Sequence, residues 1–264
     1  MKRFEIHSHS HYSNLRLLDC INRPKDLVKR AIELNLNGIA ITDHECISSH
    51  IELNQMQQDI QKDNPDFKIA LGNEIYLVKD RESGQKYYHF ILIAKNAMGH
   101  RALRELSSRA WLNSYFDRGM ERCATTYDDL KEIISKYPNS LIATSEISAL
   151  NMAEACFDID GAKQHHERIV EFVLWCKELF GDDFYFEIAP GQSKDQVSVN
   201  KRMSAVAAAF GVKMVIGTDA HFLKKEDRYV HKAYLNSKDG EREIDSFYEY
   251  SYLQSNEEII ENLK

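Results

Sequence analysis

The sequence predicts an α/β fold, a barrel-like single domain over residues 1–264. Two observations predict it. Short apolar runs, typical of buried strands, alternate with longer amphipathic runs, typical of helices, and no Ser/Gly-rich linker divides the chain. Strands that alternate with helices favour parallel βαβ units. Because barrels of this kind carry their chemistry at the carboxyl ends of the strands, the residues at those ends are the first site candidates.

The elements follow from apolar periodicity and from helix-breaking residues. Pro24 opens the first helix, and the Asn37-Gly38 pair ends it; Asn64-Pro65 ends the second helix. About seven strands are expected, at 4–7, 38–42, 68–78, 87–94, 140–144, 183–188 and 212–216. Helices are expected at 24–35, 47–62, 97–114, 127–137, 162–180, 194–210, 225–235 and from 256 onward.

Composition excludes several classes of protein. With 43% apolar residues, 4 prolines and 11 glycines among 264 residues, the chain is neither disordered nor collagen-like. No apolar run approaches the ~18 residues of a membrane span, and the first ten residues lack the apolar stretch of a signal peptide. Five scattered cysteines without a CxxC pair favour a reducing cytoplasm. We therefore expect a cytoplasmic protein with no membrane partner, and the net charge of −7 argues against a general nucleic-acid coat.

Imidazoles and carboxylates fall repeatedly at the ends of the expected strands. A single histidine there is more often structural than a ligand, but a series of HxH, DH, a strand Glu, a strand His and DxH is hard to reach by chance. Neutral imidazole and carboxylate are the usual ligands of zinc, manganese and iron. The pattern predicts a metal cluster built from His7, His9, Asp43, His44, Glu74, His89, Asp219 and His221.

Several longer stretches carry a family resemblance. They are HSHSHYS with LLDC at 7–20, LVKRAIELNLNGIAITDH at 27–44, LGNEIYL at 71–77, HFILIAKNAMGHRALRELSSRAW at 89–111, FGDDFYFEI at 180–188 and MVIGTDAHFLKKED at 214–227. Through them the sequence resembles the PHP family (polymerase and histidinol phosphatase), and within it the PHP module of bacterial DNA polymerase III alpha subunits. The resemblance implies a distorted (β/α)7 barrel that holds two or three divalent metal ions, zinc, manganese or iron.

The resemblance also implies which residues hold the metals. His7, His9, Glu74 and Asp219 would surround the first ion, Glu74 and His89 the second, and Asp19, His44 and His221 the third. Asp19 is placed through the LLD element, which follows an insertion, Asn14-Leu15-Arg16. Asp43 would orient a ligand without binding metal itself. The catalytic set implied is His7, His9, Glu74, Asp219 and His221. The other six histidines, His11, His50, His100, His165, His166 and His231, have no motif support.

The sequence departs from the family pattern at Thr144–Ile147. The polymerase modules carry a cysteine ligand of the second metal at this place, and this chain has none there. Glu146 is the candidate replacement, and as an oxygen ligand it would favour manganese or iron over zinc. A helix cap or a surface carboxylate is the alternative role for Glu146.

Clustered divalent metals suit phosphate-ester hydrolysis, and the chain contains no Walker A loop or GxSxG elbow. The resemblance implies a 3′→5′ exonuclease acting on DNA, with single-stranded DNA as substrate and a replication or DNA-processing protein as partner. Arg101, Arg104 and Arg109 are candidate phosphate contacts, with a solvated helix face as an equal alternative. Two other functions stay open. One is a small-molecule phosphomonoesterase of the histidinol-phosphatase type. The other is a non-catalytic scaffold, which the missing cysteine motivates.

Overall fold

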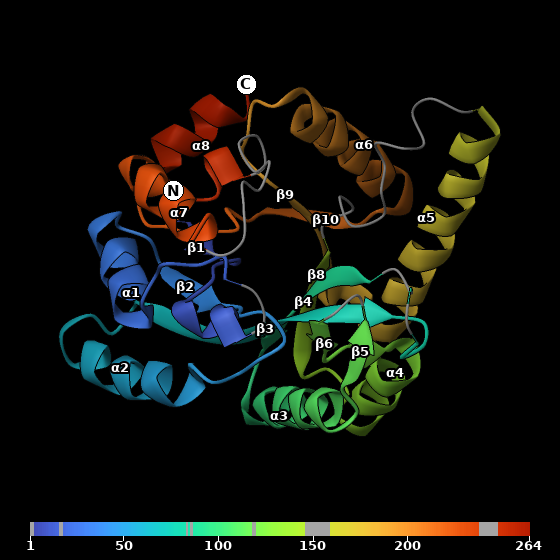
Figure 1. Ribbon diagram of the computed structural model, residues 1–264, viewed down its shortest axis with the longest axis horizontal. Helices are drawn as coiled ribbons and strands as arrows, with labels where there is room; N and C mark the ends of the chain where they lie inside the picture. Colours follow the sequence, from blue (N-terminus) through green and yellow to red (C-terminus); the bar gives the residue numbers. More distant parts are fainter. Residues whose placement is uncertain are drawn as a thin grey trace. The chain divides into compact units, whose positions relative to one another are not determined.

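The computed structural model describes residues 3–15, 18–82, 84, 87–117, 120–145, 159–237 and 248–264, with the backbone alone at 120 and 159–166 (Figure 1). The chain divides into two compact units. The first comprises residues 1–74, 189–193 and 216–264, and the second comprises residues 75–188 and 194–215. Among the described residues, no helix has both the length and the apolar character that a membrane crossing requires.

The first unit is built on a parallel ladder. β1 (Phe4–Glu5) pairs with β2 (Gly38–Ile41), and β2 pairs with the start of β3 (Lys68–Val78). Gly38 opens β2 because a Cβ there would lie 2.1 Å from the carbonyl oxygen of Lys68. α1 (Pro24–Glu33) and α2 (His50–Asp63) pack on these strands, and α7 (Arg228–Leu235) and α8 (Asn256–Asn262) belong to the same unit (Figure 1). The shared core is formed by Leu27, Val28, Ala31, Ile39, Ile41, Leu53, Phe67, Ala220 and Leu253.

Beyond the ends of these strands, the ladder continues as isolated bridges. Ser8 bridges Ala220, and His44 bridges Glu74. The backbone N–H of His9 donates to the carbonyl of Ala220 at 3.0 Å, and the N–H of Thr42 donates to the carbonyl of Ser8 at 2.8 Å. Segments 7–9, 42–44, 74 and 219–221 are therefore held side by side where the strands end.

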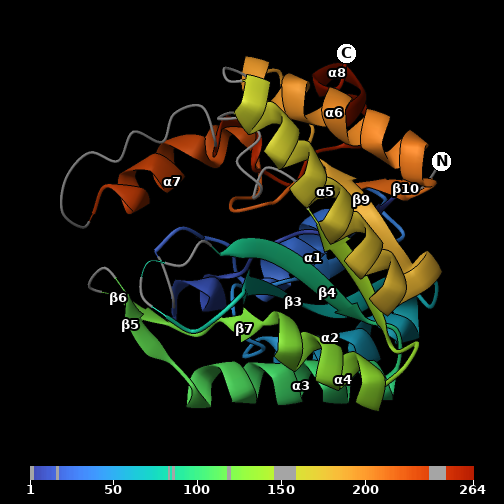
Figure 2. The same ribbon diagram turned by 90° about the vertical axis from the view of Figure 1, so that its right-hand side faces the viewer.

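The second unit contains longer connections. Its strands are β4 (Tyr88–Ala94), β8 (Leu141–Ser145), β9 (Phe184–Ile188) and most of β10 (Lys213–Ile216). Its helices are α3 (Ala97–Leu112), α4 (Tyr127–Lys136), α5 (Ile159–Phe180) and α6 (Lys194–Phe210). α3 and α4 lie side by side (Figure 2). Three short strands between them were not predicted: β5 (Tyr115–Asp117) and β6 (Met120–Arg122) form a hairpin, and β7 (Thr125–Thr126) pairs with β3.

The order of strands is β1-β2-β3-β4-β8-β9-β10, and the predicted strands and helices are confirmed to within a few residues. The expected parallel βαβ pattern does not hold at β4, which pairs antiparallel with β8, Ile91 opposite Thr144. Only residues 79–87 connect β3 to its neighbour β4. That is shorter than the dozen residues that a parallel crossover needs, so β4 returns in the opposite direction.

Candidate metal centre

Four of the predicted ligands converge at the end of the first unit's strands. Nε2 of His7 lies 3.1 Å from Oε2 of Glu74 and 3.2 Å from Oδ1 of Asp219. Nε2 of His9 lies 3.0 Å and 3.1 Å from the same two oxygens. The two Nε2 atoms are themselves 3.0 Å apart. His7, His9 and Glu74 are buried, so four donor atoms face one small volume from which water is largely excluded.

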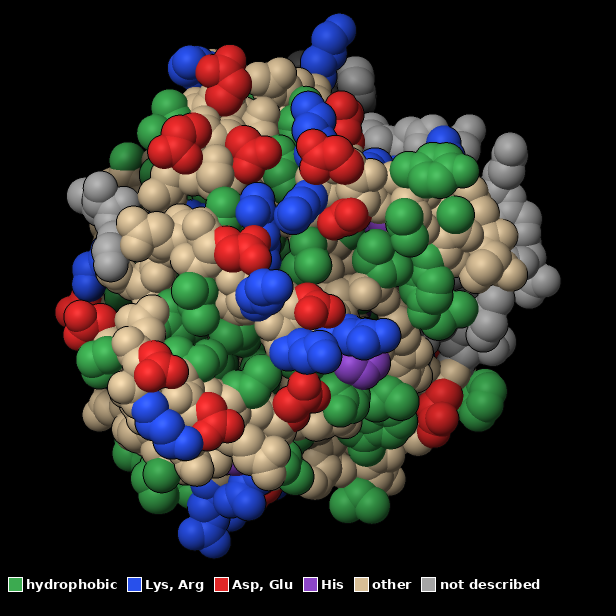
Figure 3. Space-filling view, turned by 90° about the vertical axis from the view of Figure 1, so that its left-hand side faces the viewer, with side chains coloured by type: hydrophobic (Ala, Val, Ile, Leu, Met, Phe, Trp, Pro, Cys, Tyr) green, Lys and Arg blue, Asp and Glu red, His purple; other side chains and the backbone are tan. Residues whose placement is uncertain are grey.

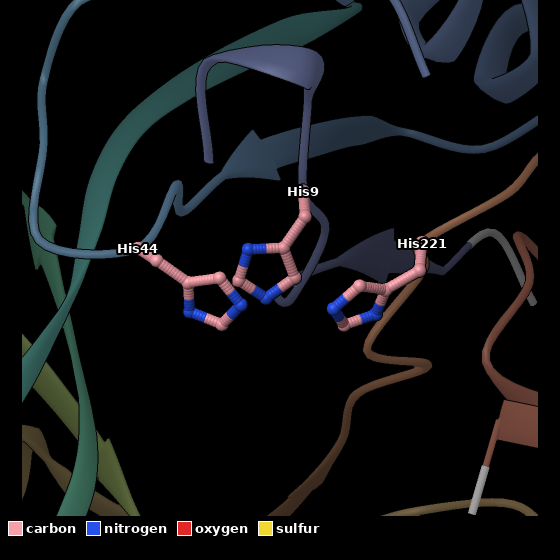
Figure 4. A group of neighbouring side chains, drawn as sticks. All are labelled: His9, His44 and His221. Atoms are coloured by element: carbon pink, nitrogen blue, oxygen red, sulfur yellow. The ribbon is translucent and has the colours of Figure 1, made fainter. Parts of the chain in front are cut away.

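Three further predicted ligands adjoin this group. Nε2 of His44 lies 3.1 Å from Oδ2 of Asp19, and Nε2 of His221 lies 3.7 Å from the same oxygen. The rings of His9, His44 and His221 come from three different segments and lie next to one another (Figure 4). The His9 and His44 rings are stacked with their centroids 4.1 Å apart, and the His221 centroid lies 4.6 Å from that of His9.

Hydrogen bonds on the outer side of the rings set the tautomers of two histidines. The hydroxyl of Ser13 donates to Oδ1 of Asp43 at 3.0 Å, so its oxygen accepts from Nδ1 of His9 at 3.2 Å. Nδ1 of His221 donates to the carbonyl of Asp219 at 2.8 Å. In both rings Nδ1 therefore carries a hydrogen, so Nε2 is the nitrogen that faces the cluster, and in the neutral ring its lone pair could bind a metal ion.

Asp43 lies behind the cluster, and its carboxylate accepts hydrogen bonds from several serine hydroxyl groups. Its carboxylate accepts from the N–H and hydroxyl of Ser10, from Ser13 and from Ser49, at 2.6 to 3.0 Å. It contacts His9 through Ser13. This is the position expected of a residue that orients a ligand without binding metal itself.

Charges within the cluster shift the pKa values of Asp19, Asp219 and His44 away from their ordinary values. Burial acts to raise the pKa of Asp19, but His44 and His221 outweigh it and hold that pKa well below its usual range. Burial likewise acts to raise the pKa of Asp219, and His221, His7 and His9 lower it further than burial raises it. Burial acts to lower the pKa of His44, whereas Glu74 and Asp19 raise it well above its ordinary value. The carboxylates therefore stay ionised, and a divalent cation that binds here would displace the proton of His44.

The residues fit a divalent metal on two further grounds. Oδ1 of Asp19 is a buried carboxylate oxygen with no hydrogen-bond partner among the described residues. A buried charged oxygen without a partner is costly, and a cation would remove that cost. The donor set of imidazole nitrogens and carboxylate oxygens is the one that zinc, manganese and iron accept.

Asp219 has an unusual backbone conformation. Its φ is +46°, in the left-handed region that Asp and Asn tolerate better than most other residues. This conformation brings both its carboxylate and the ring of His221 to the cluster, since His221 Nδ1 bonds the Asp219 carbonyl. A local strain of this kind is typical of functional sites.

Sequence reasoning missed the residues that support the ligands from behind. Glu5 is fully buried, and its Oε1 accepts the N–H groups of His7 and Thr218, both at 3.1 Å. Glu5 thus joins the HxH segment to the DxH segment, and Arg3 pairs with its other oxygen. Asn73 donates to the carbonyls of Asp43 at 2.7 Å and Cys46 at 2.9 Å. For Glu5 and Asn73 alike, the only sequence signal of a supporting role is that a polar residue stands within or beside a strand-end motif.

The other predicted site residues belong to the second unit or fall outside the described residues. His89 is on β4 in the second unit, where its ring lies 4.8 Å from that of Tyr76, and its ligand role stays a prediction. Glu146 lies outside the described residues. Arg101 and Arg104 are exposed on α3, and Arg109 bonds Glu132 at 2.8 and 2.9 Å and Asp129 at 3.2 Å. These carboxylates give Arg109 the structural role that the sequence left open beside phosphate binding.

One face of the molecule bears on nucleic-acid binding. In Figure 3, the Lys and Arg side chains of that face lie among Asp and Glu side chains. Over the described residues of this face, no continuous basic stripe forms.

The α/β fold carries, at its strand ends, a buried imidazole–carboxylate cluster that could hold a divalent metal ion. The PHP domain family model matches residues 5–191, which is more than half of the chain, and the chain belongs to this family. The predicted family and the α/β fold of the PHP type are thereby confirmed.

Two proteins that the chain resembles in sequence are named as DNA polymerases. The chain is 41% identical over 278 residues to "Probable DNA polymerase YorL" of Bacillus subtilis (strain 168), covering 97% of this chain and 21% of that protein. It is 31% identical over 234 residues to DNA polymerase III subunit alpha of Borreliella burgdorferi, covering 84% of this chain and 18% of that protein. The chain thus spans about a fifth of the length of these relatives.

Among solved structures, the chain resembles a protein from Bifidobacterium adolescentis that is assigned as a metal-dependent phosphoesterase. The TM-score is 0.49 and the identity 13%, over 99% of this chain and 96% of that one. At this level of similarity, no function is transferred from that structure.

Proposed function

We propose that this chain is a metal-dependent phosphoesterase that hydrolyses phosphodiester bonds, with 3′→5′ exonuclease action on single-stranded DNA. The observation that carries the proposal is the group of four donor atoms from His7, His9, Glu74 and Asp219, in which each imidazole nitrogen lies within 3.2 Å of both carboxylate oxygens. Asp19, His44 and His221 lie directly beside it.

His7, His9, Glu74 and Asp219 would hold one divalent ion, and Asp19, His44 and His221 another. Bound ions of this kind supply hydroxide near neutral pH and neutralise the negative charge that develops on the phosphoryl oxygens. The chain's own contribution is orientation. Asp43 and Ser13 keep the Nε2 lone pair of His9 directed at the site, and the Asp219 carbonyl does the same for His221.

DNA is proposed as the substrate because the named relatives at 41% and 31% identity are DNA polymerases. A nuclease and a DNA polymerase act on the same DNA strand. We therefore propose a replication or DNA-processing protein as the partner. The acidic carboxylates of the cluster repel a phosphodiester until cations bind. Substrate binding should therefore depend on metal.

Incubation of the purified chain with manganese and single-stranded DNA tests the proposal. A 3′-end label should be released at once as mononucleotide, whereas a 5′-end label should appear in a ladder of shortening products. Asp219→Asn should reduce the rate about 100-fold or more, because a metal ligand is lost. The matched control is Asp183→Asn, which removes a carboxylate paired with Lys95 in the second unit and should leave the rate unchanged.

Two outcomes would contradict the proposal. Turnover of histidinol phosphate without any cleavage of DNA would identify a phosphomonoesterase. Metal-loaded protein that hydrolyses neither substrate but binds a DNA-processing protein would identify a non-catalytic scaffold.

A further inference from the structure

The backbone around Asp19 is held by two side chains that lie outside the family motifs. Oδ1 of Asn14 accepts the N–H groups of Asp19 at 3.1 Å and Cys20 at 3.0 Å, and Nδ2 of Asn14 donates to the carbonyl of Cys20 at 2.7 Å. Nε2 of His231 donates to the carbonyl of Asp19 at 2.5 Å. The peptide groups on both sides of the Asp19 Cα are therefore held by hydrogen bonds from two other side chains, one five residues away in the sequence and the other 212 residues away.

His231 is itself rigidly placed. It is fully buried on α7, and its ring lies 4.9 Å from that of Phe222 and 5.0 Å from that of Tyr248. Nη1 of Arg228 lies 3.4 Å from its Nδ1. A guanidinium can only donate, so Nδ1 accepts and Nε2 carries the hydrogen that the Asp19 carbonyl receives.

One oxygen of the Asp19 side chain is paired and the other is not. Oδ2 lies 3.1 Å from Nε2 of His44 and 3.7 Å from Nε2 of His221, and Oδ1 has no hydrogen-bond partner among the described residues. The position of the backbone therefore contributes to where the carboxylate points. Asn14 belongs to the insertion that separates the HSHSHYS and LLDC stretches.

We propose that Asn14 and His231 are positioning residues that hold Asp19 as a ligand of the metal ion shared with His44 and His221. The proposal rests on the proposed function only in requiring that the cluster binds metal. The two residues act through Asp19 and contact no metal themselves. Their loss should weaken one ion and spare the ion between His7, His9, Glu74 and Asp219.

Calorimetric titration of metal-stripped protein with Mn²⁺ tests this. In Asn14→Ala and His231→Phe, one ion should bind about 10–100-fold more weakly than in the wild type, the usual effect of removing an outer support of a ligand. The other ions should keep their affinity. His231→Gln restores a donor close to the position of Nε2 and should recover wild-type affinity. Asn96→Ala is the matched control, since Asn96 also accepts two N–H groups, those of Met98 and Gly99, but at the start of α3.

A double variant shows whether the effect passes through Asp19. Asp19→Ala should weaken the same ion, and adding Asn14→Ala to it should have no further effect on Mn²⁺ affinity, because residues that act through one ligand are not additive. Cobalt spectra of each variant report the coordination independently of folding.

Three results would overturn the proposal. One is wild-type affinity in both Asn14→Ala and His231→Phe. Another is an equal loss of affinity for every ion in Asn14→Ala and His231→Phe, together with a His231→Gln variant that does not recover wild-type affinity. In either case, wild-type binding of metal leaves the proposed function standing. A wild type that binds no divalent metal overturns the proposed function together with this inference.

Discussion

At the scale of single residues, one residue of the cluster also has an unusual backbone conformation. Asp219 combines a ligand carboxylate with a φ of +46°. Asn tolerates this conformation, whereas Ala in left-handed backbone costs roughly 1–2 kcal/mol. We expect metal-free Asp219→Ala to unfold at lower urea concentration than Asp219→Asn, by about 1 kcal/mol in the free energy of unfolding. Equal stabilities of the two variants would show that the backbone at this residue is unstrained.

Glu5 provides a second prediction at this scale. Its buried carboxylate accepts N–H groups of His7 and Thr218, the hydroxyl of Thr218 at 2.9 Å and the guanidinium of Arg3. Removal of one partner from a buried pair costs about 3 kcal/mol or more. Glu5→Ala should lower the free energy of unfolding by about that amount in urea titrations. Glu33→Ala, which removes an exposed carboxylate near Lys29, should change it by less than about 0.5 kcal/mol.

Residue types in a motif could be predicted from sequence, but supporting residues could not. His7, His9, Glu74 and Asp219 were found because their chemistry and spacing are distinctive. Glu5 and His231 were missed because each acts on a backbone group far along the chain, Thr218 and Asp19 respectively. No sequence motif includes His231, so its contact with the Asp19 carbonyl could not be predicted. Only the fold brings such groups together.

At the scale of elements, long amphipathic runs gave correct helices, and the buried strands were placed within a few residues. β5, β6 and β7 were missed because two or three residues are too few for an alternating pattern to be recognised. The direction of β4 was missed for another reason: local periodicity does not report strand direction, and only the short 79–87 connection indicates it.

α4 gives a prediction of pH dependence. Asp129 accepts from the N–H and hydroxyl of Thr126 in a capping box and pairs with Arg81 and Arg109. Burial acts to raise the pKa of Asp129, but Thr126 and the arginines lower it below its ordinary value. A depressed carboxyl pKa stabilises the fold above the pKa of the unfolded chain, near 4, and this stabilisation is lost as pH falls further.

Between pH 6 and pH 3, the urea midpoint of the wild type should therefore fall more than that of Asp129→Asn. Asp182→Asn, which removes an exposed carboxylate, should keep the wild-type dependence. An identical fall in Asp129→Asn would show that these contacts do not contribute to acid stability.

At the scale of the whole molecule, metal binding should stabilise the folded chain. The seven ligands described lie in the first unit, and they come from segments between residues 7 and 221. An ion that binds only the folded state at 100 times its Kd adds about 2.7 kcal/mol. We expect the melting temperature to rise with manganese concentration and to return on chelation. His9→Ala should abolish most of this rise; an equal rise in His9→Ala would place the binding elsewhere.

The central claim is that the imidazole–carboxylate cluster is a metal centre. The most direct measurement is the metal content per chain, determined by elemental analysis of protein purified without chelator and then equilibrated with manganese. The account predicts two or more ions per chain for the wild type and a clear loss in Asp219→Asn. Fewer than one ion per chain in the wild type, or unchanged content in Asp219→Asn, would contradict it.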